Sequence, residues 1–177
     1  MYICIEVNVS NSSQFGNDND LNHVWKLEFR EAHADSIKVG HALAHMGLTP
    51  GEDKIAIYSG NRYEYDVIVL GGYHQNLANV SLYDTLGQEA VEFILDQIET
   101  KIVFVDDKKK ADMILKIESK VEKIVMLSGK IEEENEKIVS WNDFLKSGEE
   151  NASSTPQRHR SKWFNFQYIY TASNVSF

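Results

Sequence analysis

The sequence predicts an α/β fold in which a mostly parallel β-sheet is flanked by helices. Between residues 54 and 127, short apolar runs alternate with longer stretches of helical periodicity. A strand–helix–strand–helix–strand order needs crossover connections, and these join parallel strands. The stretch Lys101–Asp106 is apolar in its centre and ends in an acid, which is typical of a parallel strand buried on both faces.

Length and composition indicate one soluble globular domain. The chain has 177 residues, of which 42% are hydrophobic and 25% charged, enough for a domain with a real core. The net charge of −9 argues against a nucleic-acid surface, because phosphate binding needs clustered Lys and Arg. The single cysteine, Cys4, cannot form an internal disulfide, and we interpret it as a small residue near the N-terminus.

Targeting and membrane signals do not stand out. The longest apolar run, Val67–Tyr73, is far shorter than the roughly 20 residues that a bilayer helix needs. The first residues lack a basic segment and reach an acid at Glu6, unlike a signal peptide. We therefore expect a cytoplasmic protein.

The first third of the chain predicts a loose start, a strand and a helix. Residues 1–23 are predicted to be a mobile N-terminal segment, rich in Asn, Ser and Asp. Val24–Phe29 alternates apolar and polar residues, as a half-buried strand does. From Arg30 a helical pattern follows, with Gly47 as its C-cap. Its inner positions are Ala32, Ser36, Val39, Leu43 and Met46.

Two strand–helix pairs follow. Lys54–Ser59 and Asn79–Leu82 are predicted strands, and Tyr63–Leu77 and Gln88–Ile98 are predicted helices. In the first helix Tyr65, Ile68, Val69 and Gly72 share a face, and the pair Gly71-Gly72 predicts tight packing, because glycine destabilises a helix interior by roughly 1 kcal/mol. In the second helix Ala90, Val91, Ile94, Leu95 and Ile98 form the inner side. Thr85 is expected to cap this helix, with Glu89 and Glu92 near its positive end.

The remaining elements are shorter. Lys108–Lys120 predicts a helix that buries Ala111, Ile114 and Leu115, and Lys123–Leu127 predicts the next strand. After an acidic linker over residues 130–136, Ile138-Val139 is expected to be an edge strand. Trp141–Leu145 is expected to be a small helix with Ser140 as its N-cap and Gly148 at its end. Glu149–Ser161 is predicted to be a flexible loop and Gln167–Thr171 the last strand.

Two motifs carry a family resemblance. Tyr83-Asp84-Thr85-Leu86-Gly87 follows an apolar run and opens a helix, and about 22 residues upstream lies Ile55-Ala-Ile-Tyr-Ser-Gly-Asn-Arg-Tyr-Glu-Tyr65. Together these stretches resemble the N-terminal part of long-chain acyl-CoA synthetases, members of the adenylate-forming, AMP-binding superfamily. That family has Pro where this chain has Ser81, and the five residues after Leu82 match without a gap. The resemblance covers residues 24–171, which we expect to be a partial AMP-binding domain.

The resemblance implies fatty acid activation. In the family, a fatty acid carboxylate attacks ATP to give an acyl-adenylate, and CoA then displaces AMP; Mg²⁺ and a Ser/Gly/Thr-rich loop stabilise the phosphates. That loop would begin at Thr171, but residues 172–177 form a divergent tail without glycine or lysine. We therefore expect no catalytic, cofactor-binding or metal-binding residue in these 177 residues, and little or no ligase activity. The break predicts a truncated gene model, a retained intron or a frameshift.

The resemblance also implies partners and a location. ATP, Mg²⁺ and CoA would serve the full-length enzyme, with fatty acid, ATP and CoA as its substrates. Members of the family are often peripheral to membranes such as the endoplasmic reticulum or peroxisome. Any membrane contact is expected through parts outside this sequence, and no nucleic-acid partner is expected.

Other residues have competing interpretations. Asn61-Arg62 lies in a strand-to-helix loop, where α/β folds build sites, but Arg62 is favoured as a surface charge or salt-bridge partner. Asp106-Asp107 could be a metal or phospho-acceptor site, and a solvated helix start is favoured. Histidines at helical spacing could bind zinc, and an exposed face is favoured for His33, His41 and His45. The aromatic residues from Trp163 to Tyr170 are favoured as strand and core.

Two other functions remain open. The chain could be a non-catalytic truncated product that acts as an interaction module. Less favoured is an unrelated nucleotide-binding or receiver-like domain, against which the ungapped match at Tyr83–Gly87 argues.

Overall fold

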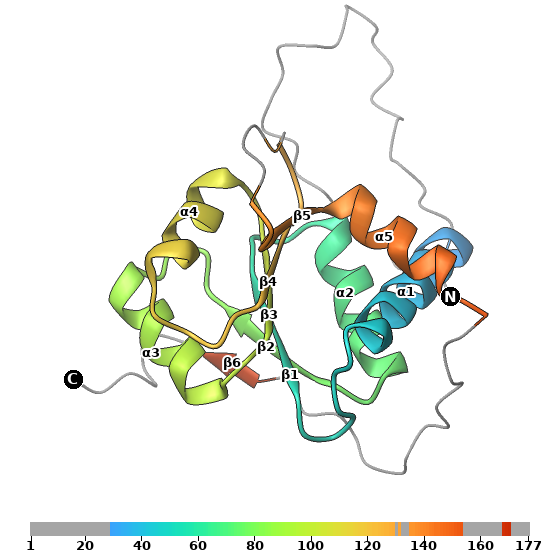
Figure 1. Ribbon diagram of the computed structural model, residues 1–177, viewed down its shortest axis with the longest axis horizontal. Helices are drawn as coiled ribbons and strands as arrows, with labels where there is room; N and C mark the ends of the chain where they lie inside the picture. The colour runs from blue at the N-terminus through green and yellow to red at the C-terminus, as the bar shows by residue number, and fades with distance from the viewer. Residues whose placement is uncertain (1–28, 130, 132–134, 154–167, 171–177) are drawn as a thin grey trace, which may run out of the picture.

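A six-stranded, entirely parallel sheet organises the protein (Figure 1). The computed structural model describes residues 29–129, 131, 135–153 and the backbone of 168–170. The strand order is β5-β4-β3-β1-β2-β6. The strands are β1 (Lys54–Tyr58), β2 (Ala78–Leu82), β3 (Ile102–Val105), β4 (Lys123–Met126), β5 (Ile138–Ser140) and β6 (Tyr168–Tyr170). The predicted α/β class and parallel sheet are confirmed.

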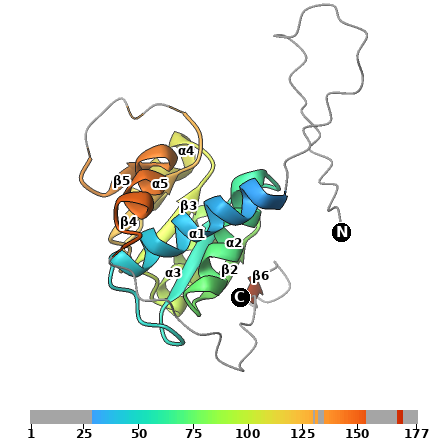
Figure 2. The ribbon, with the colours of Figure 1, turned by 90° about the vertical axis from the view of Figure 1, so that its right-hand side faces the viewer.

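Five helices cover both faces of this sheet. Helices α1 (Phe29–His45), α2 (Tyr63–His74) and α5 (Trp141–Glu150) lie on one face, which Figure 2 views from their side. Helices α3 (Gln88–Ile98) and α4 (Lys108–Lys116) lie on the other. The predicted mobile segment 1–23, residues 24–28 of the predicted strand, residues 154–161 of the predicted loop and the tail 172–177 fall outside the described residues. Two ends of these predictions are corrected, because Phe29 begins α1 and Glu149-Glu150 end α5.

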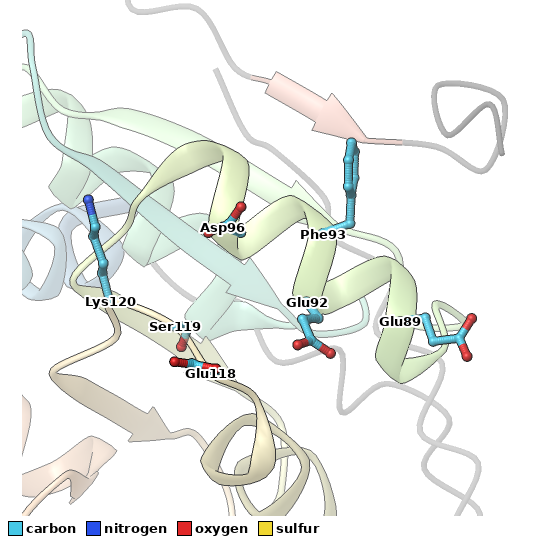
Figure 3. Close-up of a pocket in the computed structure, with 7 residues that line it drawn as sticks. All are labelled: Glu89, Glu92, Phe93, Asp96, Glu118, Ser119 and Lys120. Atoms are coloured by element: carbon cyan, nitrogen blue, oxygen red, sulfur yellow. The ribbon is translucent and has the colours of Figure 1, made fainter.

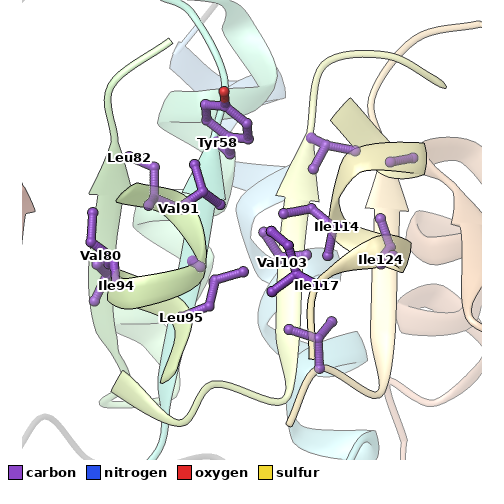
Figure 4. Close-up of a cluster of buried hydrophobic side chains, with 14 of the residues drawn as sticks. Tyr58, Val80, Leu82, Val91, Ile94, Leu95, Val103, Ile114, Ile117 and Ile124 are labelled. Carbon is purple, nitrogen blue, oxygen red and sulfur yellow. The ribbon is translucent and has the colours of Figure 1, made fainter. Parts of the chain in front are cut away.

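The core consists of two apolar clusters separated by the sheet. Successive strand side chains point to opposite faces, so Ile55 and Ile57 pack toward α1 and α2 while Ala56 and Tyr58 pack toward α3 and α4. Figure 4 shows the second cluster, where α3 and α4 lay apolar side chains over the strands. All four residues of β3 are fully buried, as the central apolar run predicted.

The paired glycines of α2 permit close packing on both sides of the helix. A Cβ on Gly71 would lie 2.3 Å from Val39 Cγ1 on α1, and a Cβ on Gly72 would lie 2.5 Å from Asn79 Oδ1 on β2. The predicted tight packing is confirmed. The predicted inner face of α2 is corrected. Its buried residues are Val67, Ile68, Gly71 and Gly72.

Two helices end earlier than predicted. Helix α2 ends at His74, not near Leu77, because Asn76 takes a left-handed φ of 56°. The N–H groups of Asn76 and Leu77 then donate to Tyr73 and Gly72 carbonyls at 3.2 and 3.0 Å, which is a Schellman ending. Helix α4 ends at Lys116, not Lys120, and the predicted core residue Leu115 is 37% exposed.

Two predicted caps are corrected. The N-cap of α3 is Gly87, without a side-chain hydrogen bond, and Thr85 lies exposed in the preceding turn. Glu89 lies in the first turn of α3, as predicted. Ser140 does cap α5, accepting from the Asp143 N–H at 3.1 Å. That helix continues to Glu150, so Gly148 lies inside it rather than at its end.

Candidate functional site

The strands all end at one edge of the sheet, and the chain's two motifs leave from it. Residues 59–62 follow β1, residues 83–87 follow β2, and Asp106-Asp107 follows β3. Parallel register brings these carboxyl ends together: Tyr58 lies opposite Leu82 on one side and Val105 on the other. Ligands of open α/β sheets bind at this edge, so it is the candidate site.

Asp106 joins the loops after β1 and β3. Its Oδ2 accepts from the Gly60 N–H at 3.1 Å and from Lys110 Nζ at 2.7 Å, and its Oδ1 lies 3.5 Å from Arg62 Nη1. Its own carbonyl accepts from Ser128 N–H at 2.9 Å. Asp106 therefore links three loops of the edge: its carboxylate contacts the loop after β1, and its carbonyl contacts the segment after β4.

Lys110 brings the loop after β2 into the same network. Its ammonium pairs with Asp84 as well as Asp106, and it lies 4.5 Å from the centre of the Tyr58 ring. The side chain is 12% exposed, whereas that of Asp84 is 57% exposed. A cation over an aromatic face and between two carboxylates is strongly held.

Tyr58 on β1 holds the same loop through a hydrogen bond. Its hydroxyl donates to the Leu86 carbonyl at 2.7 Å, and the Leu86 N–H closes a turn onto the Tyr83 carbonyl at 3.0 Å. The Tyr83–Gly87 motif is thus held by Tyr58 on β1 and by Lys110 on α4. Its Tyr83 side chain remains 53% exposed.

Three groups of this network, Lys110, Arg62 and Tyr58, have pKa values above their ordinary values. Burial lowers the pKa of Lys110, but its bonds to Asp106 and Asp84 outweigh burial and raise the pKa above its ordinary value. The bidentate bond to Glu64, at 2.7 and 3.0 Å, raises the pKa of Arg62. Burial raises the pKa of the Tyr58 phenol. The three groups hold the loops of the edge together through these bonds.

The sequence-predicted residues fall partly in this network. Arg62 is a salt-bridge partner, as favoured. The solvated helix start is confirmed for Asp107, the N-cap of α4, which accepts from the Lys110 N–H at 3.0 Å; Asp106 instead joins the edge network. His33, His41 and His45 lie on α1. Among the described residues no group of three potential ligands could hold a metal ion.

Lys110 and Glu64 were not singled out from the sequence. The Asp106–Lys110 pair spans one helical turn, a spacing that favours ion pairs, so it could have been found. The Lys110–Asp84 pair joins residues 26 apart, and nothing in the sequence predicts it. The aromatic residues 163–167 lie outside the described residues.

A separate depression runs along α3. It has a volume of about 620 Å³ and is lined by Glu89, Glu92, Phe93, Asp96, Glu118, Ser119 and Lys120 (Figure 3). Four carboxylates against one lysine repel phosphates, so this depression does not suit ATP.

The comparisons with known proteins agree with this architecture. A parallel sheet covered on both faces by helices is a doubly wound α/β architecture, in which ligands generally bind at the carboxyl edge. The chain belongs to the AMP-binding enzyme family, whose profile matches residues 14–171. This confirms the family resemblance drawn from the two motifs.

Its relatives include long-chain acyl-CoA synthetases. It is 37% identical over 137 residues to long chain acyl-CoA synthetase 5 of Arabidopsis thaliana, covering 72% of this chain and 20% of that protein. It is 35% identical over 104 residues to long-chain-fatty-acid–CoA ligase 1 of Homo sapiens, covering 58% and 15%. The chain thus spans about a fifth or less of the length of these curated relatives.

Solved structures share the fold. An acyl-CoA synthetase of Brucella canis superimposes with a TM-score of 0.65 at 18% identity, covering 83% of this chain and 26% of that one. The anthranilate CoA ligase AuaEII, solved with anthranoyl-AMP, gives 0.60 at 18% identity, covering 75% and 24%. Within the described part of the chain, no helix is long and apolar enough to cross a membrane.

Proposed function

We propose that the protein to which these residues belong is an ATP-dependent long-chain fatty acid–CoA ligase. It would convert a fatty acid, ATP and CoA into acyl-CoA, AMP and pyrophosphate, with Mg²⁺. The observation that carries this proposal is the pair of motifs shared with long-chain acyl-CoA synthetases, which meet at the carboxyl edge through the Tyr58–Leu86 hydrogen bond. Residues 24–171 would supply part of its AMP-binding domain.

We infer that these residues alone do not bind ATP–Mg²⁺ tightly. In support, no group of three potential metal ligands is found among the described residues, and Lys110 and Arg62 at the edge are engaged by carboxylates. The register of β2 with β6 pairs Leu82 with Tyr170, so the last described residue lies opposite the residue that precedes the Tyr83–Gly87 motif. We assign no step of the reaction to residues in this chain.

We propose further that the 177-residue polypeptide alone forms no acyl-adenylate. The test is ATP–pyrophosphate exchange with a C16 fatty acid, using acetate as the matched short-chain control. The 177-residue chain is expected to give no exchange above the protein-free rate. A product whose sequence continues beyond Thr171 into a Ser/Gly/Thr-rich loop with Pro-Lys is expected to give exchange that depends on the C16 acid. Robust exchange by the 177-residue chain contradicts its inactivity, and an inert longer product contradicts the ligase assignment.

A further inference from the structure

The Tyr83–Gly87 motif is held at the sheet edge by contacts from outside its own strand and helix. Within the motif, the described backbone bonds are one turn, from Leu86 N–H to the Tyr83 carbonyl, and the start of α3, from Val91 N–H to the Gly87 carbonyl. Gly87 has open space around its Cβ position. A segment with so few local bonds opens easily unless tertiary contacts hold it.

Lys110 supplies such a tertiary contact, because it binds both the loop after β2 and the loop after β3. It reaches Asp84 of the motif and Asp106 after β3, and it covers the ring of Tyr58, whose hydroxyl holds Leu86. The Lys110–Asp106 pair, with side chains 12% and 23% exposed, is more shielded from water than an ordinary surface ion pair. The Asp84 side chain is mostly exposed, so burial contributes little to holding it in place and its bond to Lys110 contributes most.

We propose that Lys110 is a positioning residue that keeps the Tyr83–Gly87 motif closed over Tyr58. The motif begins where β2 ends, at Leu82, which lies opposite Tyr170 of β6. Lys110 thereby fixes the segment that follows Leu82, next to the carboxyl end of β6. The relevance of this segment to ATP rests on the proposed function, whereas the positioning of the motif by Lys110 does not depend on it.

Amide hydrogen exchange on the 177-residue chain tests this positioning without requiring ligase activity. In Lys110→Met the lost bonds to Asp84 and Asp106 should speed exchange of the Leu86 amide about tenfold, since bonds to charged groups contribute more than neutral ones. The amides of β1 and β3 should keep their wild-type exchange rates. Asp84→Asn, at a mostly exposed position that folding tolerates, should speed the same amide. Lys110→Arg should restore most of the protection.

The matched control is Lys120→Met, which breaks the Lys120–Glu99 pair at 2.6 Å with both side chains more than 60% exposed. It should leave the Leu86 amide unchanged. The proposal is overturned if Lys110→Met and Asp84→Asn leave Leu86 exchange at the Lys120→Met level. It is equally overturned if Lys110→Met accelerates all core amides alike, because that result indicates general destabilisation.

Discussion

Gly148→Ala should destabilise the protein, although alanine is the better helix former. Gly148 lies inside α5, where that helix crosses α1. A Cβ at this position would lie 1.9 Å from the Lys38 carbonyl oxygen and 2.7 Å from its carbon. Real Cβ contacts essentially never fall below 3.0 Å, so the two helices must separate by about an ångström.

The expected size follows from two opposing terms. Overpacking against rigid backbone costs about 3 kcal/mol, the upper end of the usual range. Replacing glycine by alanine within a helix returns about 1 kcal/mol. The net loss is about 2 kcal/mol, which for a chain of this size lowers the unfolding midpoint by roughly 4–8 °C.

The assay is thermal and urea unfolding followed by helical circular dichroism. The matched control is Gly60→Ala, because a Cβ at Gly60 meets nothing within 4 Å; it should be neutral or slightly stabilising. Gly148→Ala unfolding at or above the midpoint of Gly60→Ala would refute the close α1–α5 crossing.

Three further outcomes follow from the structure. Ser140→Ala should lower the free energy of unfolding in urea by about 1 kcal/mol, because it removes the N-cap of α5. Thr85→Ala should lower it by less than about 0.5 kcal/mol, because Thr85 is exposed and caps no helix. Equal losses in the two variants would contradict Gly87 as the N-cap of α3. Thr100→Val should cost about 1–2 kcal/mol in the same assay, since the buried hydroxyl lies 2.8 Å from the Lys54 carbonyl; an unchanged midpoint would exclude that bond. Burial alone would raise the pKa of Asp53, but bonds from the Thr49 N–H and the Lys101 ammonium outweigh burial and lower it. The stability that Asp53 contributes is therefore present above about pH 4 and lost as the pH falls through its lower folded pKa. The difference in the free energy of unfolding between wild type and Asp53→Asn should therefore shrink between about pH 5 and 2. A difference that stays constant over this range would contradict the lowered pKa of Asp53.

The elements could be predicted because their signals are local. The apolar run of β3 and the inner faces of α1 and α3 follow from hydrophobic periodicity, and the Gly71-Gly72 pair indicated close packing correctly. Helix ends were less predictable. A left-handed Asn76 ends α2, and asparagine is a weaker signal for that conformation than glycine.

The sequence predicted where the candidate site lies but not which side-chain contacts form it. Motifs after β1 and β2 pointed to the carboxyl edge, since parallel strands align their ends. The contacts that hold the edge together depend on tertiary approach: Lys110 meets Asp84 across 26 residues. Gly148 was predicted as a helix end, but it lies inside α5 and packs against α1. A glycine needed for close approach has the same sequence signature as a C-cap.

The most direct test of the central claim is the sequence of the transcript through and beyond the codon for Thr171. We expect a transcript that continues beyond the end of β6 at Tyr170 into a Ser/Gly/Thr-rich loop followed by Pro-Lys. If every transcript instead ends after the codon for Phe177, the ligase assignment is contradicted, and the function of this chain lies in its partners rather than in ATP chemistry.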